Sequence, residues 1–255
     1  MIPVVETFYS IQGEGPFVGN PSIFIRLGGC NLKCKGFGCK VNINGEEITG
    51  CDTIYAVDTK HFKDKWNYYS SFQELVEDVE KLINLKNNYY KPDIVITGGE
   101  PTLYINNPVL IDTITYFISR GYRVTVETNA TQEINFKKNN ILKKVNFIMS
   151  VKLSSSGEPE YKRIKPEVIN SILKETEYSC FKFVVDSKMC KEGLSEIFDI
   201  LKTVPYYADV FLMPLGENKE EIDSNIIAVA DACKNFGFKL SDRLHIRVWG
   251  NVPKT

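Results

Sequence analysis

The chain has 255 residues, enough for one large α/β domain or two smaller ones. Its 31 Lys and Arg residues nearly balance 32 Asp and Glu residues, and 43% of the residues are hydrophobic. This composition predicts a globular protein and excludes the basic excess typical of direct nucleic-acid or anionic-membrane binding. The N-terminus lacks a signal-peptide pattern and no 18 consecutive residues are apolar, so we expect a cytoplasmic protein without a membrane segment.

Short apolar segments alternate with segments of helical periodicity along most of the chain. The expected strands occupy residues 22–27, 93–97, 123–128, 146–151, 180–185 and 209–213. The expected helices occupy residues 71–85, 107–121, 195–204 and 224–237. Parallel strands joined by helices form an open sheet or a partial barrel, which binds ligands at the C-terminal ends of its strands. We therefore predict an α/β fold with functional residues in the loops that follow strands.

Residues 35–69 interrupt this alternation. The segment contains an Asn44-Gly45 pair, which predicts a hairpin turn, and an aromatic, charged run, HFKDKWNYY. No linker or low-complexity tract divides the rest of the chain. We therefore expect one domain over residues 1–255, with an insertion at about 35–69.

Four of the seven cysteines lie in the stretch GGCNLKCKGFGCKVNINGEEITGCDT, residues 28–53. The stretch directly follows the first expected strand, so it belongs to the predicted functional edge. Soft thiolates suit an iron–sulfur cluster or zinc, and free thiols are the third alternative. The spacing differs from the two close pairs of a typical structural zinc site. The other three, Cys180, Cys190 and Cys233, are assigned no chemistry, since two of them lie in apolar segments.

Several motifs resemble those of the radical S-adenosylmethionine superfamily. CNLKC follows the first expected strand, ITGGEP follows the second, and Cys51-Asp52-Thr53 ends the cysteine stretch. Within that superfamily, ETFYSIQGEGPFVGNPSIFIRLGGCNLKC, together with VETNAT, SVK, LMP and LHIRVWGN, resembles the 7-carboxy-7-deazaguanine synthase family. This resemblance covers nearly the whole chain and implies a modified partial (β/α)6-type barrel with mainly parallel strands.

The resemblance also implies a reaction and its cofactors. In this family, 6-carboxy-5,6,7,8-tetrahydropterin contracts to 7-carboxy-7-deazaguanine with loss of ammonia, a step of queuosine and 7-deazapurine biosynthesis. The implied cofactors are a 4Fe-4S cluster, S-adenosylmethionine and Mg²⁺, and the implied partners are a second copy of the chain and a flavodoxin-type reductant. Three protein thiolates would leave one iron open to S-adenosylmethionine, whose reductive cleavage supplies a radical that abstracts a substrate hydrogen.

The motif matches carry the metal ligands over to this chain. Cys30 and Cys51 match the first and third cluster ligands. Cys34 fits the CNLKC spacing of the second ligand, but a hairpin turning at Asn44-Gly45 would bring Cys39 beside Cys51 and make Cys39 the alternative. We favour Cys34. Thr53 matches the Mg²⁺ ligand, and its hydroxyl suits a hard cation.

The remaining motif residues are expected to contact the substrate or S-adenosylmethionine. The substrate residues implied are Gln12, Gly13, Glu14, Arg26, Thr97 and His245. The S-adenosylmethionine residues implied are Asp52, Gly98, Gly99, Glu100, Glu127, Thr128, Ser150, Lys152 and Met213. Arg26 can bind a carboxylate through two hydrogen bonds. No residue is assigned as an acid or base, although His245 is a candidate.

Two details depart from the family pattern, and two rival functions stay open. Val151 replaces a proline between Ser150 and Lys152, and Met213 replaces a glutamine, whose side-chain amide is lost. The first rival is another radical S-adenosylmethionine enzyme, such as a glycyl-radical activase, against which the QGEG motif and Arg26 argue. The second rival is a zinc-stabilised binding module.

Overall fold

The computed structural model describes residues 1–43, 45–84, 89–252 and 254. Its main feature is a nine-stranded sheet with the strand order β11-β10-β9-β8-β7-β6-β2-β1-β5. The strands of this sheet are β1 (Ile2–Ile11), β2 (Pro21–Leu27), β5 (Asn67–Tyr69), β6 (Asp93–Gly98), β7 (Val124–Thr128), β8 (Asn146–Met149), β9 (Ser179–Val185), β10 (Asp209–Pro214) and β11 (Lys239–Leu240). A separate hairpin pairs β3 (Cys39–Ile43) with β4 (Glu46–Gly50).

The sheet is mostly parallel, which confirms the predicted fold class. Every neighbouring pair from β2 to β11 is parallel, and the six expected strands are β2, β6, β7, β8, β9 and β10. No strand was expected over residues 2–11. This segment forms β1, which runs antiparallel to both β2 and β5 and extends the sheet beyond the parallel strands.

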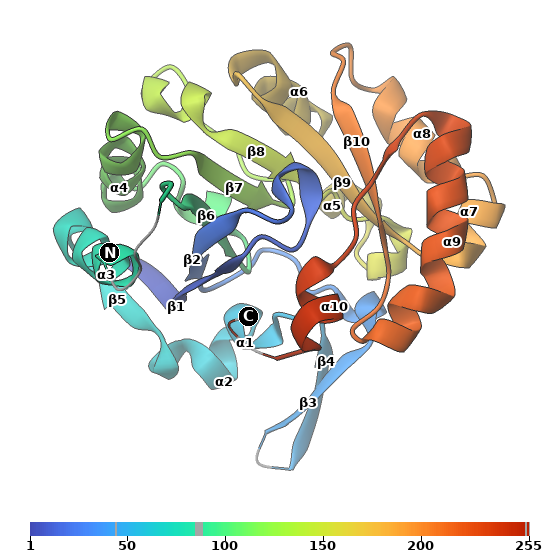
Figure 1. Cartoon of the computed structure of the whole chain (residues 1–255), viewed down its shortest axis with the longest axis horizontal. Coiled ribbons are helices and arrows are strands. Elements are labelled where there is room, and N and C mark those ends of the chain that lie inside the picture. Colours follow the sequence, from blue (N-terminus) through green and yellow to red (C-terminus); the bar gives the residue numbers. More distant parts are fainter. Residues whose placement is uncertain (44, 85–88, 253, 255) are drawn as a thin grey trace.

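Helices cover the outer side of the curved sheet. The α-helices are α1 (Ile54–Val57), α2 (Thr59–Phe62), α3 (Phe72–Asn84), α4 (Pro108–Ser119), α5 (Glu160–Arg163), α6 (Pro166–Glu175), α7 (Ser187–Lys191), α8 (Ser195–Lys202), α9 (Lys219–Phe236) and α10 (Leu244–Trp249). Figure 1 shows α3, α4, α6, α8 and α9 around the sheet's outer rim. The four expected helices are α3, α4, α8 and α9, and α9 begins earlier than predicted, at Lys219, where the side chain of Asn218 caps it by accepting from the N–H of Glu221.

Alternate residues of the parallel strands face different environments. In β2, Ile23, Ile25 and Leu27 belong to the main hydrophobic core under the helices, whereas Phe24 and Arg26 face the other side. The same alternation continues through the other parallel strands as far as β10. Because side chains alternate across a strand, one face of the sheet builds the core and the other is left to line a site.

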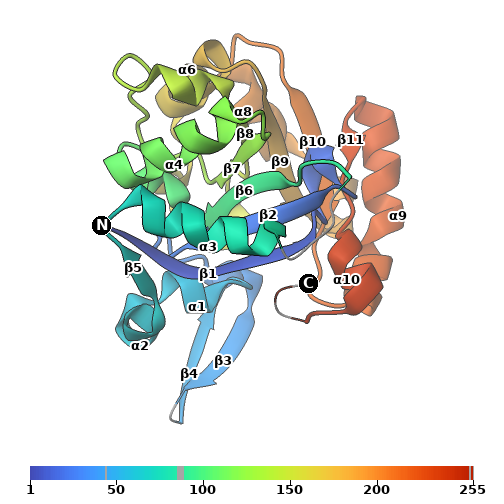
Figure 2. The ribbon, with the colours of Figure 1, turned by 60° about the vertical axis from the view of Figure 1, so that its left-hand side comes forward.

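The segment 35–69 forms the hairpin, two short helices and β5. The hairpin projects from the body of the molecule, as Figure 2 shows, while β5 pairs with β1 and anchors the end of the segment in the sheet. Gly45 has a φ of +86°, as a tight turn requires. Its predicted partner Asn44 lies outside the described residues.

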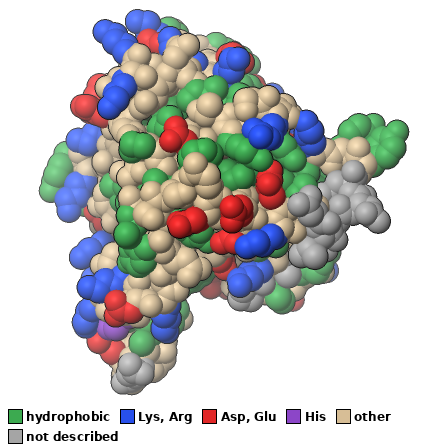
Figure 3. Space-filling model, turned by 90° about the vertical axis from the view of Figure 1, so that its left-hand side faces the viewer, with side chains coloured by type: hydrophobic (Ala, Val, Ile, Leu, Met, Phe, Trp, Pro, Cys, Tyr) green, Lys and Arg blue, Asp and Glu red, His purple; other side chains and the backbone are tan. Residues whose placement is uncertain are grey.

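The surface shows no dominant charge. On the face in Figure 3, Lys and Arg side chains lie among Asp, Glu and hydrophobic ones, which agrees with a formal net charge of −1. Within the described ranges, no helix is both long and apolar enough to cross a membrane.

Candidate active site

A cavity of about 460 Å³ lies beside the C-terminal ends of the parallel strands. The structure places every motif residue from the sequence analysis around it. These residues are Gln12, Gly13, Glu14, Arg26, Cys30, Cys34, Cys39, Cys51, Asp52, Thr53, Thr97, Gly98, Gly99, Glu100, Glu127, Thr128, Ser150, Lys152, Met213 and His245. Their convergence from segments across the chain follows from the parallel topology, which brings the ends of successive strands to one edge.

The other three clustered thiols lie within electrostatic range of Cys51, which raises the pKa values of Cys30, Cys34 and Cys39. Burial raises the pKa of Cys30 to about 12, and the nearby Glu100, Cys34 and Cys51 add to the increase. Burial likewise raises the pKa of Cys34 to about 11, although the ammonium of Lys152 opposes the change. Cys51 also contacts the hydroxyl of Thr53, with 3.4 Å between Sγ and Oγ1. Cys30, Cys34 and Cys51 therefore form one group on the cavity wall.

Cys39 is oriented differently from this group. It begins β3 and pairs with Gly50, next to Cys51, as a hairpin was expected to arrange it. Its thiol, however, donates a short hydrogen bond to the carboxylate of Glu217, and burial together with this carboxylate raises its pKa. The Cys39 thiol is thus bonded to a protein acceptor, whereas the Cys34 thiol lies near the ammonium of Lys152.

The donor set fits a cluster better than a single metal ion. In the part of the chain that the structure describes, no three His, Cys, Asp or Glu side chains converge closely enough to hold one ion. A zinc site requires such convergence, with ligands about 2.0–2.3 Å from the metal. Thiolates that bind separate irons of a cube need not converge on a point, and coordination to iron deprotonates thiols whose pKa is raised.

The Gly98-Gly99-Glu100 turn packs tightly against the loop that precedes Cys30. A Cβ atom at Gly99 would lie 2.2 Å from the backbone oxygen of Gly29, and the Glu100 N–H donates to that same oxygen at 2.8 Å. The Glu100 carboxylate accepts hydrogen bonds from Thr128 Oγ1 and the Asn129 N–H, each at 2.7 Å, and burial raises its pKa. The glycines therefore let the cavity wall approach the cysteine loop.

A hydrogen-bonded group joins Gln12, just after β1, to Thr97 of β6 and Glu127 of β7. Glu127 accepts from Gln12 Nε2 at 3.2 Å and from Thr97 Oγ1 at 3.0 Å. The Gln12 Oε1 atom in turn accepts from the N–H of Glu14 at 3.1 Å. These contacts fix the QGEG loop against the ends of β6 and β7, with polar side chains directed into the cavity.

Arg26 is held from one side and open on the other. Its Nε donates to Glu6 Oε1 at 2.8 Å, and the Tyr55 hydroxyl donates to the same oxygen at 3.2 Å. Its terminal guanidinium nitrogens donate to no protein atom in the described residues. Since Arg26 lines the cavity, these nitrogens remain available for an anionic ligand group.

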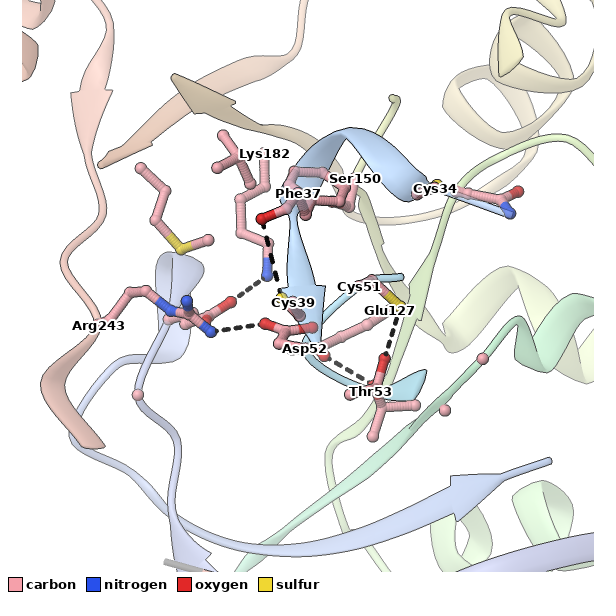
Figure 4. A pocket seen from close by; sticks show the side chains of 18 of the residues that line it. Cys34, Phe37, Cys39, Cys51, Asp52, Thr53, Glu127, Ser150, Lys182 and Arg243 are labelled. Atoms are coloured by element: carbon pink, nitrogen blue, oxygen red, sulfur yellow. Dashed lines mark hydrogen bonds and ion pairs between the residues drawn. The ribbon is translucent and has the colours of Figure 1, made fainter. Parts of the chain in front are cut away.

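Glu14 lies between two buried cations. Lys182 Nζ is 2.6 Å from Glu14 Oε2, and Arg243 Nε is 3.0 Å from Glu14 Oε1. Burial alone would raise the pKa of Glu14, but the charges of Lys182 and Arg243 lower it well below its usual value. Arg243 also pairs with Asp52 at 2.9 Å, as Figure 4 shows. The cavity therefore holds a permanent ionic network.

The C-terminal segment packs against the QGEG loop. The N–H of Leu244 donates to the oxygen of Gly13 at 2.9 Å, and the Ser241 hydroxyl accepts from the N–H of Gly15 at 2.8 Å. The His245 ring covers Gly13, since a Cβ there would lie 1.9 Å from Nδ1. Burial lowers the pKa of His245, which keeps the imidazole neutral near pH 7.

The far wall of the cavity carries the Ser150-Val151-Lys152 turn and Met213. Lys152 Nζ donates to Ser150 Oγ at 3.0 Å, and the N–H of Ser150 donates to the oxygen of Thr128 at 2.7 Å. These bonds order the turn although Val151 replaces the proline of the family pattern. Thr53 occupies the N-cap position of α1, yet its side chain makes no capping bond, so its hydroxyl faces Cys51 instead.

Sequence reasoning missed several residues of the cavity. Lys182, Arg243, Glu6, Asn129 and Glu217 were not singled out, although all but Glu6 line the cavity. Lys182 carried a visible signal, because it is a lone charge inside the apolar run CFKFVV and is only 5% exposed. Arg243 and Glu217 carried none, since their partners lie far away in the sequence.

Comparisons with known proteins agree with this site. Residues 11–172 match a family described as a 4Fe-4S single cluster domain. The 7-carboxy-7-deazaguanine synthases of Rhodopirellula baltica and Buchnera aphidicola subsp. Schizaphis graminum are each 30% identical to this chain. The first match covers 97% of this chain and 86% of the relative, and the second covers 95% and 96%. A 28% identical synthase of Halobacterium salinarum matches over 100% of this chain and 93% of its own length.

Solved structures show the same fold. The crystal structure of QueE from Escherichia coli matches with a TM-score of 0.64 and 23% identity, covering 96% of this chain and 94% of that one. Streptococcus suis SuiB bound to S-adenosylmethionine matches with a TM-score of 0.53 over 89% of this chain and 50% of that chain, at 13% identity. Fold, cysteine group and family match together define a 4Fe-4S protein of the radical S-adenosylmethionine class. Within that class, the chain belongs to the 7-carboxy-7-deazaguanine synthase family.

Proposed function

We propose that the cavity is the active site at which 6-carboxy-5,6,7,8-tetrahydropterin contracts to 7-carboxy-7-deazaguanine with release of ammonia. The observation that carries the proposal is the meeting of Cys30, Cys34 and Cys51 with Gln12 and Arg26 on one cavity wall. The matches to named synthases over nearly the full chain support the same reaction. The product would enter queuosine or other 7-deazapurine biosynthesis.

Cys30, Cys34 and Cys51 would hold a 4Fe-4S cluster. Cys51 influences both Cys34 and Cys39, but Cys34 also influences Cys30, which supports Cys34 as the second ligand, and the bond between Cys39 and Glu217 argues against the alternative. Bound there together with S-adenosylmethionine, a cluster reduced by one electron would supply the radical chemistry that hydrogen abstraction from the substrate requires. The turns at Gly98–Glu100 and Ser150–Lys152, with Asp52, Glu127, Thr128 and Met213, would hold S-adenosylmethionine.

The chain's own residues orient the substrate. The free nitrogens of Arg26 would bind its carboxylate through two hydrogen bonds, with Glu6 fixing the plane of the guanidinium. Gln12, Glu14, Thr97 and the neutral imidazole of His245 would bind the ring, and Gly13 lets the imidazole approach. The hydroxyl of Thr53 would bind Mg²⁺ together with substrate oxygens and water.

The domain organisation, oligomeric state, electron donor and cellular location are proposed on the same family resemblance. We treat residues 1–255 as one radical S-adenosylmethionine domain with an insertion at 35–69, acting as a homodimer that receives electrons from a flavodoxin-type protein. Seven free cysteines support a reducing, cytoplasmic setting. Sedimentation of the anaerobic protein tests the dimer.

Product analysis tests the proposed reaction. Anaerobic protein with dithionite, S-adenosylmethionine, Mg²⁺ and 6-carboxy-5,6,7,8-tetrahydropterin should yield 7-carboxy-7-deazaguanine, detected by its ultraviolet absorbance. Formation of 5′-deoxyadenosine without ring contraction would favour another radical S-adenosylmethionine enzyme. One bound zinc without iron would favour a zinc-stabilised module.

Cysteine variants test the ligand assignment. Cys30→Ala, Cys34→Ala and Cys51→Ala should each lose nearly all iron and sulfide, because three thiolates are the minimum that retains the cluster. Cys39→Ala is the matched control from the same loop and should keep full iron content. Loss of iron in Cys39→Ala with retention in Cys34→Ala would make Cys39 the ligand.

A further inference from the structure

Arg243 connects three segments of the cavity that are distant in the sequence. Its Nε donates to Glu14 Oε1 at 3.0 Å, its Nη2 to Asp52 Oδ2 at 2.9 Å, and its Nη1 to the backbone oxygen of Gly216 at 2.6 Å. The Arg243 side chain is 12% exposed and Glu14 is 15% exposed, so the bond to Glu14 is largely shielded from water, whereas the bond to Asp52 is open to it. Figure 4 shows the guanidinium directed at Asp52.

The two carboxylates that Arg243 joins belong to loops with different tasks. Asp52 lies between Cys51 and Thr53, at the proposed cofactor end of the cavity. Glu14 lies in the QGEG loop, at the proposed substrate end. Arg243 itself precedes α10, whose first N–H is bonded to Gly13. A planar guanidinium with donors at fixed angles holds both carboxylates in one geometry, which a lysine in its place cannot do.

We propose that Arg243 is a positioning residue that couples substrate binding in the QGEG loop to the placement of the Cys51–Thr53 loop. This inference rests on the proposed function. Substrate that orders Glu14 orders Asp52 through the shared guanidinium, and thereby holds the cofactor loop in the geometry that hydrogen abstraction requires. Without Arg243, the two loops move independently.

The surroundings of Glu14 and Asp52 allow this positioning role to be distinguished from simple charge neutralisation. Lys182 lies 2.6 Å from the other oxygen of Glu14, so Glu14 keeps a cationic partner when Arg243 is replaced. Asp52 is 45% exposed and can be solvated when its partner is lost. The Arg243→Met variant therefore retains an ionised, paired Glu14 and loses the connection between the loops. Arg247→Met is the matched control, because Arg247 lies in α10, the helix that directly follows Arg243, and pairs instead with Asp223 and Asp242.

Hydrogen–deuterium exchange of the cluster-loaded, unreduced protein tests the coupling without turnover. In the unaltered protein and in Arg247→Met, 6-carboxy-5,6,7,8-tetrahydropterin should slow exchange in residues 12–17 and in residues 50–57. In Arg243→Met, protection of residues 12–17 should remain, whereas protection of residues 50–57 is lost. Equal protection of both segments in Arg243→Met would overturn the proposal.

Turnover supplies a second, independent readout. The ratio of 5′-deoxyadenosine to 7-carboxy-7-deazaguanine should rise in Arg243→Met, with product formation falling by about 10- to 100-fold, the range that misplacement of reacting groups produces. If Arg243→Met does not hold the cluster, Arg243→Lys serves, because it preserves the charge near Glu14 but not both bonds. An unchanged ratio in whichever variant carries full iron would refute the coupling. Absence of product from the unaltered protein would instead refute the proposed function.

Discussion

The two faces of β9 show how differently one strand is specified on its two sides. Phe181, Phe183 and Val185 face the helices and join the main hydrophobic core. Lys182 and Val184 alternate with them and face the cavity. Packing on the helix side requires apolar side chains of suitable volume, and a short segment of sequence is enough to recognise them. The cavity side depends on partners such as Glu14, which is 168 residues away from Lys182 in the sequence.

This difference predicts that substitutions on the two faces fail in different ways. A side chain on the helix side is held by close packing, so truncating it creates a void and lowers the free energy of unfolding. A cavity residue is held by directed polar bonds, so its loss disturbs the geometry of the site more than the stability of the fold.

The largest loss of stability is expected from Phe183→Ala on the helix side. The ring is fully buried and stacks on Phe181 with 5.6 Å between the ring centroids. Its removal should lower the free energy of unfolding by about 3–5 kcal/mol, as for other buried aromatic truncations. Anaerobic denaturant titration measures this change, and Phe183→Leu should recover most of it. A loss below about 1 kcal/mol would show that the two faces are less distinct than their packing indicates.

A smaller loss of stability is expected from Gly13→Ala, because the cavity side is tightly packed at this position. Gly13→Ala places a Cβ 1.9 Å from Nδ1 of His245, so the ring and α10 must move. Overpacking of this kind costs about 1–3 kcal/mol, and it should also weaken substrate binding because the QGEG loop shifts. Calorimetry of substrate binding and denaturant titration measure the two effects.

Relief of the overlap provides the check on that explanation. In the double variant Gly13→Ala, His245→Ala, the imidazole is gone, and the backbone nitrogen of residue 245, at 3.0 Å from the added Cβ, is the closest remaining contact. The double variant should therefore be more stable than Gly13→Ala alone. A double variant that is less stable than Gly13→Ala would show that the clash is not the cause.

The same contrast explains how far sequence reasoning reached. Six of the seven parallel strands were predictable, because β-branched runs such as DIVIT are typical of strands buried in a parallel sheet; the two-residue β11 was too short to recognise. The motif residues were predictable as a set, since loops after parallel strands meet at one edge. Residues 2–11 were missed because β1 has polar residues on its cavity side, with Glu6 turned toward Arg26. Arg243 was missed because its bonds to Glu14 and Asp52 span 229 and 191 residues.

Lys182→Met tests the cavity side with a change close in volume. Glu14 would keep Arg243 as a partner, so the free energy of unfolding should fall by only about 1–3 kcal/mol. Product formation should fall much more, because Glu14 is no longer held from both sides. Steady-state kinetics with full iron content measures the change, and Val184→Ile, next to it in the strand, is the control for a general disturbance of β9. Normal kinetics with a stability loss as large as that of Phe183→Ala would show that Lys182 serves the stability of the fold rather than the geometry of the site.

The smallest effect is expected for the exposed ion pair between Lys40 and Glu47, whose N–O distance is similar to that of the buried pair between Lys182 and Glu14. Lys40 Nζ lies 2.8 Å from Glu47 Oε1 across the hairpin, compared with 2.6 Å for Lys182 and Glu14. The side chains of the hairpin pair are 60% and 58% exposed, whereas those of the cavity pair are 6% and 15% exposed. Water screens the exposed pair, so Lys40→Ala should change the free energy of unfolding by less than about 1 kcal/mol and leave iron content intact. If Lys40→Ala proved as costly as Lys182→Met, distance rather than burial would govern these pairs, and the contrast between the buried cavity and the exposed surface would fail.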